Sequence, residues 1–220
     1  IAQRLYQENF ASLRFDFRGH GESKGNQEDV TIIGELLDIK ASIGKFTKRS
    51  KQVSILATSF GAGSAILYAA KNKDKVRSLI LLCPVLDYNS TFIKPLTPWA
   101  KESFNEKGFK NLDEKGYLLL DGTFKIGAKM IEEFRIIKPY ELLKEIKCPI
   151  LTIHGDEDSM VPYSVSKKYG TPNNKSKFIT FKGAEHGFID PNDETGNSTK
   201  SKQHKENLIT ELIKWLNKNG

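Results

Sequence analysis

Apolar and polar residues follow two rhythms along the chain, one typical of strands and one typical of helices. Short apolar or alternating runs predict strands at residues 10–17, 52–58, 76–83, 149–154 and 177–182. Apolar residues that recur at helical spacing from Val30 to Ala41 predict a helix over residues 30–47. Further helices are predicted at residues 2–9, 60–72 and 202–217. Strands that alternate with helices in this way predict an α/β fold with a mainly parallel sheet flanked by helices.

One long segment breaks this rhythm. More than fifty residues between Pro84 and Pro139 show no strong strand pattern, although they carry many aromatic residues among charges. A loop of that length without secondary structure is improbable in a compact domain, so we expect residues 85–137 to form an inserted, largely helical cap or lid. Its aromatic side chains form the cap's own core in the commoner interpretation and line a substrate pocket in the other.

Composition and charge narrow the class of protein. The 220-residue chain is 38% hydrophobic, which is enough to bury a core, and its apolar runs are too short for a membrane span. The net charge is +7, but lysines are interleaved with acidic residues, so we expect no nucleic-acid partner. Cys83 and Cys148 are placed at opposite ends of parallel strands, too far apart for a disulfide. Reduced thiols suit a cytoplasmic protein.

The sequence Ala57-Thr58-Ser59-Phe60-Gly61 joins a predicted strand to a predicted helix that begins with small residues. A serine at such a turn is exposed above the sheet edge, and its neighbours must be small because the backbone doubles back. The usual pattern is Gly-x-Ser-x-Gly, and here Ala57 replaces the first glycine with another residue of low bulk. The alternative interpretation is that Ser59 only caps the N-terminus of the helix.

A serine nucleophile requires a base, and the base requires an acid that orients it. Asp156 and Asp158 follow the predicted strand at 149–154, and His186 follows the predicted strand at 177–182. The loops after parallel strands emerge at the same edge of the sheet, so these side chains can converge on Ser59. The order serine, aspartate, histidine therefore indicates a hydrolase triad.

The other histidines have weaker claims to catalysis. We interpret His20 as a loop-packing residue, His154 as a buried residue with its hydrogen bonds satisfied, and His204 as a solvated residue of a lysine-rich segment. No group of residues has the spacing of metal ligands, so no metal site is expected.

Four motifs together resemble the α/β-hydrolase family, in the group of bacterial carboxylesterases that includes cinnamoyl or feruloyl esterases and monoacylglycerol lipases. One is the turn at Ser59. The others are an Asp-x-Arg-Gly-x-Gly-x-Ser loop at residues 16–23, a His-Gly-x-x-Asp-x-x-Val-Pro stretch at residues 154–162 and a Gly-x-x-His-x-Phe stretch at residues 183–188. They span nearly the whole chain in the family's order, which makes the resemblance specific.

The resemblance implies a role for each candidate. Ser59 is the nucleophile, His186 the general base, and Asp158 the orienting acid, whereas Asp156 has a structural role and bonds loop amides. The backbone N–H of Phe60 donates to the oxyanion, and the second donor of the family comes from a loop that this sequence lacks.

The resemblance also implies a domain organisation and a reaction. The N-terminal strands of the fold are expected to be missing from this chain, so that residues 1–84 and 138–220 form a truncated core around the cap. The implied activity is hydrolysis of a small-molecule carboxylic ester through an acyl-serine intermediate, without a cofactor. The alternatives are an acyl thioesterase or serine aminopeptidase with the same triad, or a non-catalytic ligand-binding protein. The oligomeric state is open.

Overall fold

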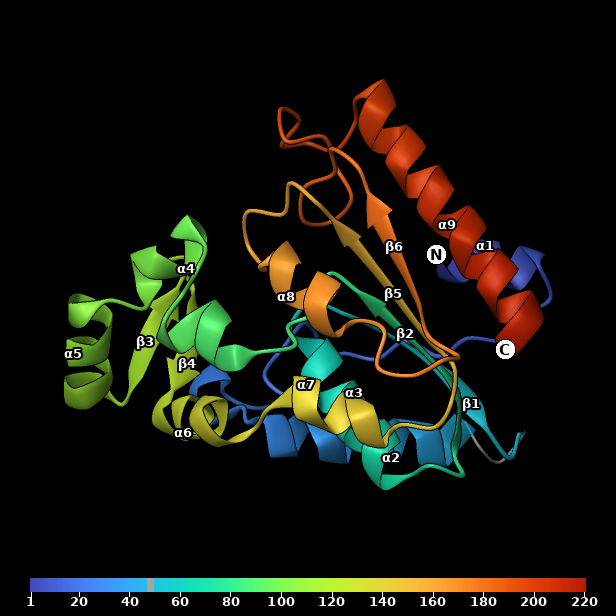
Figure 1. The fold of residues 1–220 in the computed structure, drawn as a ribbon. Helices are drawn as coiled ribbons and strands as arrows, with labels where there is room; N and C mark the ends of the chain where they lie inside the picture. Colours follow the sequence, from blue (N-terminus) through green and yellow to red (C-terminus); the bar gives the residue numbers. More distant parts are fainter. Residues whose placement is uncertain (47–49) are drawn as a thin grey trace.

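The central sheet contains four parallel strands in the order β1-β2-β5-β6 (Figure 1). The computed structural model describes residues 1–46 and 50–220. The strands are β1 (Val53–Thr58), β2 (Val76–Leu82), β5 (Ile150–Gly155) and β6 (Lys177–Phe181). In the register of the sheet, Thr58 pairs with Leu82, and Leu82 pairs with Ile153. The carboxyl ends of the strands therefore lie at one edge, as the sequence predicts.

Helices cover both faces of this sheet (Figure 1). One face packs against α2, α3, α7 and α8, and the other packs against α1 and α9. Their bounds are α1 (Ala2–Gln7), α2 (Ile32–Phe46), α3 (Gly61–Lys71), α7 (Pro139–Leu142), α8 (Tyr163–Tyr169) and α9 (Thr199–Asn219). Helices α1, α2, α3 and α9 confirm the predicted ones, although Thr47 lies outside the described residues, whereas α7 and α8 were not predicted. Short 3-10 turns occur at η1 (Gln27–Asp29) and η3 (Leu143–Glu145).

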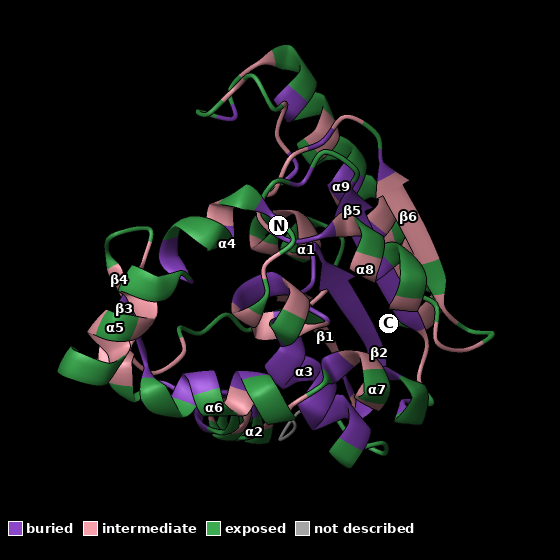
Figure 2. Ribbon diagram, turned by 60° about the vertical axis from the view of Figure 1, so that its left-hand side comes forward, coloured by how far each residue is buried: buried purple, intermediate pink, exposed green. Residues whose placement is uncertain are grey.

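The innermost elements explain the apolar runs in the sequence. Figure 2 shows β2 and α3 buried along nearly their whole length, whereas β6 at the sheet edge is mostly half-buried. A central parallel strand is covered on both faces and therefore reads as a continuous apolar run. The small residues at the start of α3 allow it to pack closely: a Cβ at Gly63 would overlap the hydroxyl of Tyr88.

The predicted strand at residues 10–17 is wrong, because this segment has no strand assignment in the structure. A cleft of about 900 Å³ separates it from β1, and both segments line that cleft together with α1 and α2. A strand exists only where a neighbour satisfies its backbone hydrogen bonds, and residues 10–17 have no such neighbour among the described residues. Residues 10–17 have the alternating pattern of a strand, but no strand among the described residues pairs with them.

The segment between β2 and β5 is largely helical, but it also contains two short strands that were not predicted. It contains η2 (Asn89–Ile93), α4 (Pro98–Ser103), α5 (Glu106–Lys115), β3 (Tyr117–Leu120), β4 (Phe124–Gly127) and α6 (Ala128–Ile136). Strands β3 and β4 form an antiparallel hairpin, with Asp121 and Gly122 at φ angles of 51° and 67°. Two successive positive φ angles define a type I′ turn, for which Asp-Gly is a preferred sequence. The Asp-Gly pair is visible in the sequence, but the hairpin was not predicted from it.

The aromatic residues of this inserted segment pack mainly against one another. Phe134 lies against Phe92 and Tyr88, with ring centroids 4.8 and 5.0 Å apart, and all three rings are buried. Phe60, which follows the candidate nucleophile, packs on the same cluster. The interpretation of these rings as the segment's own core agrees with this packing.

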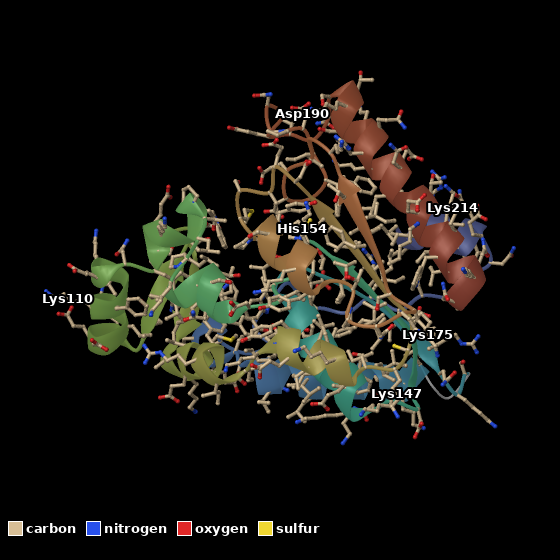
Figure 3. All side chains as sticks on the ribbon, viewed as in Figure 1. Lys110, Lys147, His154, Lys175, Asp190 and Lys214 are labelled. Atoms are coloured by element: carbon tan, nitrogen blue, oxygen red, sulfur yellow. The ribbon has the colours of Figure 1, made fainter. Side chains whose placement is uncertain are left out.

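Charged residues and cysteines are distributed as the sequence predicts. Figure 3 shows Lys110, Lys147, Lys175 and Lys214 at the periphery and His154 inside the fold. Cys83 and Cys148 are free thiols. No helix within residues 1–46 or 50–220 combines the length and apolarity required to cross a bilayer.

Candidate active site

Ser59 occupies a sharp turn between β1 and α3. Its φ angle is 49°, in the left-handed region that serine rarely adopts. Its backbone N–H donates to the carbonyl of Leu82 at 2.9 Å, and its own carbonyl accepts from Val85 at 3.0 Å, so the turn is anchored to the end of β2. No side-chain hydrogen bond caps α3. The turn therefore presents the Ser59 hydroxyl without using it to cap the helix, and Ala57 is small enough to permit this geometry.

Asp158 is the most highly bonded acid of the candidate site. Its Oδ1 accepts from the backbone N–H groups of Met160 at 2.9 Å and Val161 at 2.8 Å. Its Oδ2 lies 2.7 Å from Nδ1 of His186 and 2.9 Å from Nε2 of His154. Burial alone would raise the pKa of this carboxyl, but the hydrogen bonds from His154 and His186 outweigh burial and hold the pKa well below its usual value. Asp158 is therefore an ionised, fixed carboxylate.

The contact with Asp158 determines how His186 is oriented. Because an ionised carboxylate only accepts hydrogen bonds, Nδ1 of His186 carries the proton and Nε2 is left as an acceptor. The side chain of His186 is 16% exposed, so Nε2 can meet a substrate. The structure brings Asp158 and His186 into contact, whereas Ser59 Oγ forms no hydrogen bond with any described residue. In ligand-free sites, catalytic hydrogen bonds often tighten only when substrate binds.

Two further acids hold the loops that carry the triad candidates. Oδ1 of Asp156 accepts from the backbone N–H of Gly183 at 2.7 Å, which is the loop-bonding role predicted for it. Oε1 of Glu185 accepts from both the backbone N–H and the hydroxyl of Ser159, at 2.8 and 2.9 Å. Glu185 thus ties the loop of Asp158 to the loop of His186. Sequence reasoning missed this role, since residues 26 positions apart give no spacing signal.

Phe60 is placed as an oxyanion donor would be. It precedes α3, where the unpaired N–H groups of a helix and its dipole favour negative charge. Its backbone N–H has no acceptor among the described residues. A tetrahedral intermediate on Ser59 would place its oxygen near this group.

The loop at residues 16–23 is a rigid support beside the site. The guanidinium of Arg18 pairs with Asp38 of α2, with Nη2 and Oδ1 2.7 Å apart. Gly21 has a φ angle of 50°, and a Cβ there would overlap the carboxylate of Asp16. Nδ1 of His20 lies 3.0 Å from the carbonyl oxygen of Arg18, which agrees with its interpretation as a packing residue.

The other two histidine predictions need correction. Nε2 of His204 is buried without a partner in the described part of the chain, and its ring lies 6.2 Å from that of Phe181, so His204 is not simply solvated. The reason is that this face of α9 packs on the sheet, as the buried Leu208 shows. His154 is buried as predicted, but only Nε2 is bonded, and Nδ1 has no partner in the described part of the chain.

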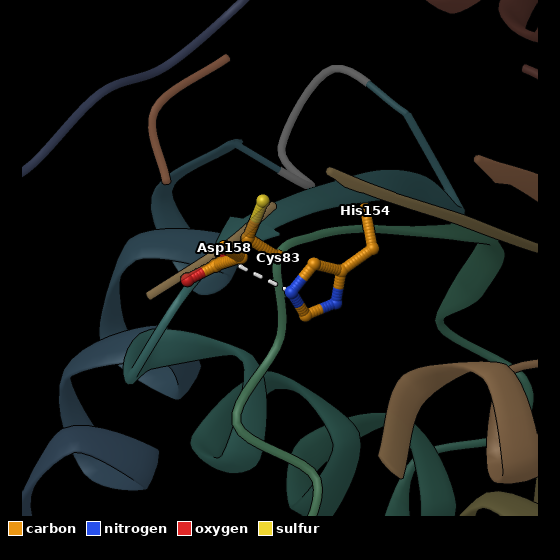
Figure 4. A group of neighbouring side chains, drawn as sticks. All are labelled: Cys83, His154 and Asp158. Atoms are coloured by element: carbon orange, nitrogen blue, oxygen red, sulfur yellow. Dashed lines mark hydrogen bonds and ion pairs between the residues drawn. The ribbon is translucent and has the colours of Figure 1, made fainter. Parts of the chain in front are cut away.

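Cys83, His154 and Asp158 form a buried cluster that the sequence spacing did not predict (Figure 4). One potential ligand atom from each lies within 4.8 Å of the others. The donor set fits a metal poorly, because the carboxylate oxygens already accept four hydrogen bonds. Burial, followed by the charge of Asp158, also raises the pKa of the Cys83 thiol well above its usual value, whereas metals bind the thiolate. The cluster is better described as part of the support of Asp158.

Comparison with known proteins agrees with this geometry. The chain matches the family model described as serine aminopeptidase, S33, over residues 1–118 and the dienelactone hydrolase family model over residues 134–219. The bifunctional esterase/perhydrolase DCH of Acinetobacter calcoaceticus is 38% identical to it, over 89% of this chain and 83% of that protein. The chain belongs to the α/β-hydrolase family.

Solved structures of an esterase and a lipase share the fold of this α/β hydrolase. Est1E of Butyrivibrio proteoclasticus, solved with ferulic acid, has a TM-score of 0.64 and 23% identity, over 90% of this chain and 75% of that one. The monoacylglycerol lipase of Paleococcus ferrophilus has a TM-score of 0.65 and 18% identity, over 97% and 87% of the two chains. These likenesses show the shared fold. The chain spans 57% of the length of mouse serine hydrolase BPHL and 50% of bovine palmitoyl-protein thioesterase ABHD10, which it also matches.

Proposed function

We propose that this α/β hydrolase is a serine esterase that cleaves small-molecule carboxylic esters through an acyl-serine intermediate. The observation that supports this best is the 2.7 Å hydrogen bond between a buried, ionised Asp158 and Nδ1 of His186. That bond leaves Nε2 of His186 free to act as a base at the sheet edge where the turn of Ser59 ends β1. The esterase relative DCH, which covers most of the chain, supports the same reaction class.

The proposed reaction has two halves, acylation of Ser59 by the ester and hydrolysis of the acyl-serine by water. Ser59 Oγ attacks the ester carbonyl carbon while Nε2 of His186 takes the hydroxyl proton, and Asp158 stabilises the resulting imidazolium. The Phe60 N–H donates to the developing oxyanion. Collapse of the tetrahedral intermediate breaks the C–O bond, and His186 returns the proton to the leaving alcohol. Water then attacks the acyl-serine while His186 takes its proton, and collapse of the second intermediate breaks the bond from the acyl carbon to Oγ as His186 returns the proton to Ser59. One ester and one water thus give an acid and an alcohol.

We propose that residues 85–137 are a cap on this site, carried by a core of residues 1–84 and 138–220. The ring of Phe60 lies 6.0 Å from that of Phe92 and 5.8 Å from that of Phe134. The residue that offers the oxyanion N–H is therefore packed against the inserted segment. This contact supports a cap that helps to fix the donor as well as to cover the substrate.

The remaining parts of the proposal rest on composition. Dispersed lysines and two free thiols support a cytoplasmic enzyme without a nucleic-acid partner or a cofactor.

A thioester or peptide bond remains the alternative scissile group, since the chain matches both a palmitoyl-protein thioesterase and the S33 aminopeptidase model. A triad does not by itself choose among acyl groups.

Active-site labelling followed by a substrate panel tests the proposal. A fluorophosphonate probe should label the wild-type protein and not Ser59→Ala. Short p-nitrophenyl esters and methyl ferulate should then be hydrolysed faster than acyl-CoA thioesters or aminoacyl anilides. Failure to label Ser59 would favour the non-catalytic alternative, and dominance of thioesters or anilides would replace the ester assignment.

A further inference from the structure

His154 makes a contact with the triad that the proposed mechanism does not use. It is the penultimate residue of β5 and is fully buried, with Nε2 2.9 Å from Oδ2 of Asp158. The same oxygen accepts from Nδ1 of His186, so one carboxylate oxygen receives two imidazole donors (Figure 4 shows the His154 bond). The two donors approach from different elements, β5 and the loop after β6. Asp158 is therefore held by His154 as well as by its proposed catalytic partner.

The direction of the hydrogen bond between His154 and Asp158 follows from their surroundings. Asp158 is ionised and can only accept, so Nε2 of His154 carries a hydrogen. Nδ1 is buried and has no partner among the described residues. His154 is thus a buried ring that donates to Asp158 through Nε2.

Neighbouring groups fix the ring in this position. The ring of Tyr163, from α8, lies edge-on at 5.8 Å from the ring of His154, and the Tyr163 hydroxyl lies 2.6 Å from Oγ1 of Thr180 on β6. The thiol of Cys83, at the end of β2, completes the surroundings of Asp158. Within residues 1–46 and 50–220, the titratable groups that face Asp158 besides His154 are Cys83 and His186.

We propose that His154 is a positioning residue, whose Nε2–H holds the Asp158 carboxylate in the orientation that presents Oδ2 to His186. The inference rests on the proposed function, since it assigns His154 a role in that same reaction. Without this bond, Asp158 would retain its two backbone donors on Oδ1 but could rotate Oδ2 away from the imidazole. The imidazole of His186 would then be correctly oriented in only part of the enzyme molecules, which lowers kcat without changing substrate contacts.

A pair of substitutions separates hydrogen bonding from packing. His154→Phe keeps a planar ring and removes the donor, whereas His154→Gln places an amide N–H near the position of Nε2. We expect kcat of the phenylalanine variant to fall by about ten- to a hundredfold with KM nearly unchanged, and the glutamine variant to recover most of that loss. His204→Phe is the matched control, because it changes a half-buried histidine that does not contact Asp158.

The pH profile of kcat/KM would not change if His154 acted only through packing. The acid limb of kcat/KM reports proton uptake by the coupled carboxylate and imidazole. Loss of a donor makes the carboxylate more basic, so the acid limb of His154→Phe should move to higher pH by about one unit, and that of His154→Gln should stay near wild type. Equal rates and equal profiles for all variants would overturn the inference. So would equal losses in both variants with an unmoved acid limb.

An NMR titration distinguishes failure of this inference from failure of the proposed function. With ¹³C-labelled aspartate, the carboxyl resonance of Asp158 should titrate at higher pH in His154→Phe than in wild type, and this measurement needs no turnover. Absence of Ser59-dependent hydrolysis in wild type would reject the esterase proposal alone. An Asp158 titration unchanged by His154→Phe would reject the hydrogen bond on which the positioning role depends.

Discussion

Glu35 offers a test of the packing between α2 and α3. It is 1% exposed, and its Oε2 accepts from the hydroxyl of Ser64 on α3 at 2.6 Å. Burial raises the pKa of this carboxyl from 4.5 to about 7, since the Ser64 bond offsets only part of the cost of removing a charge from water. The native protein therefore keeps a proton on Glu35 at pH values where the unfolded chain has lost it.

This difference gives stability a definite dependence on pH. Between pH 4.5 and about 7 the native state binds more protons than the unfolded state, so the free energy of unfolding falls as pH rises through that window. A pKa difference of this size corresponds to about 3 kcal/mol, because each pH unit contributes about 1.4 kcal/mol. Below the window the contribution is fully present, and above it the buried carboxylate is ionised and the contribution is lost.

Urea unfolding of Glu35→Gln between pH 4.5 and pH 8 measures the effect. The amide can accept from Ser64 and does not titrate, so its stability relative to wild type should increase by about 3 kcal/mol across this range. Glu132→Gln, at an exposed position of α6, is the control and should track wild type throughout. A constant difference between Glu35→Gln and wild type at all pH values would refute the reasoning.

Two further substitutions test the site and its support. In Asp158→Asn, an amide NH₂ group replaces one carboxylate oxygen and would face the N–H donors that now bond to that oxygen. We expect kcat for an ester to fall by about a thousandfold or more, while the circular dichroism spectrum stays that of the native protein. In Gly63→Ala, the new Cβ would overlap the hydroxyl of Tyr88, and thermal unfolding should show a loss of about 1–3 kcal/mol. Gly44→Ala, where the Cβ meets nothing within 4 Å, should instead gain about 0.5–1 kcal/mol, and a gain at Gly63 would contradict the packing described.

Local patterns predicted the elements whose neighbours are present. Strands β1, β2, β5 and β6 pair with one another, so their apolar runs were sufficient to find them. Residues 10–17 carry a similar pattern but face a cleft instead of a partner strand, and pairing is not a local property. The hairpin around Asp121 and Gly122 is the opposite case, because its turn signal was local and was overlooked.

The candidate site shows the same division. The order of elements predicted that Ser59, Asp158 and His186 follow strands that end at one edge of the sheet, and the structure brings Asp158 and His186 into contact. The bond from Glu185 to Ser159 and the second donor from His154 depend on side chains that meet only after the loops have folded. A histidine that ends a buried strand gives no indication in sequence of which carboxylate it will contact.

Backbone strain in the described part of the chain is concentrated around the same residues. Five non-glycine residues there have positive φ angles: Asn9, Ser59, Cys83, Asp121 and Phe188. Asparagine and aspartate tolerate this conformation, whereas serine, cysteine and phenylalanine pay about 1 kcal/mol or more for it. All three strained residues follow β1, β2 or β6 at the edge where Asp158 meets His186. Packing alone gives no reason to retain strain in three separate loops, whereas the proposed site, which must hold a hydroxyl, a carboxylate and an imidazole in a fixed arrangement, does.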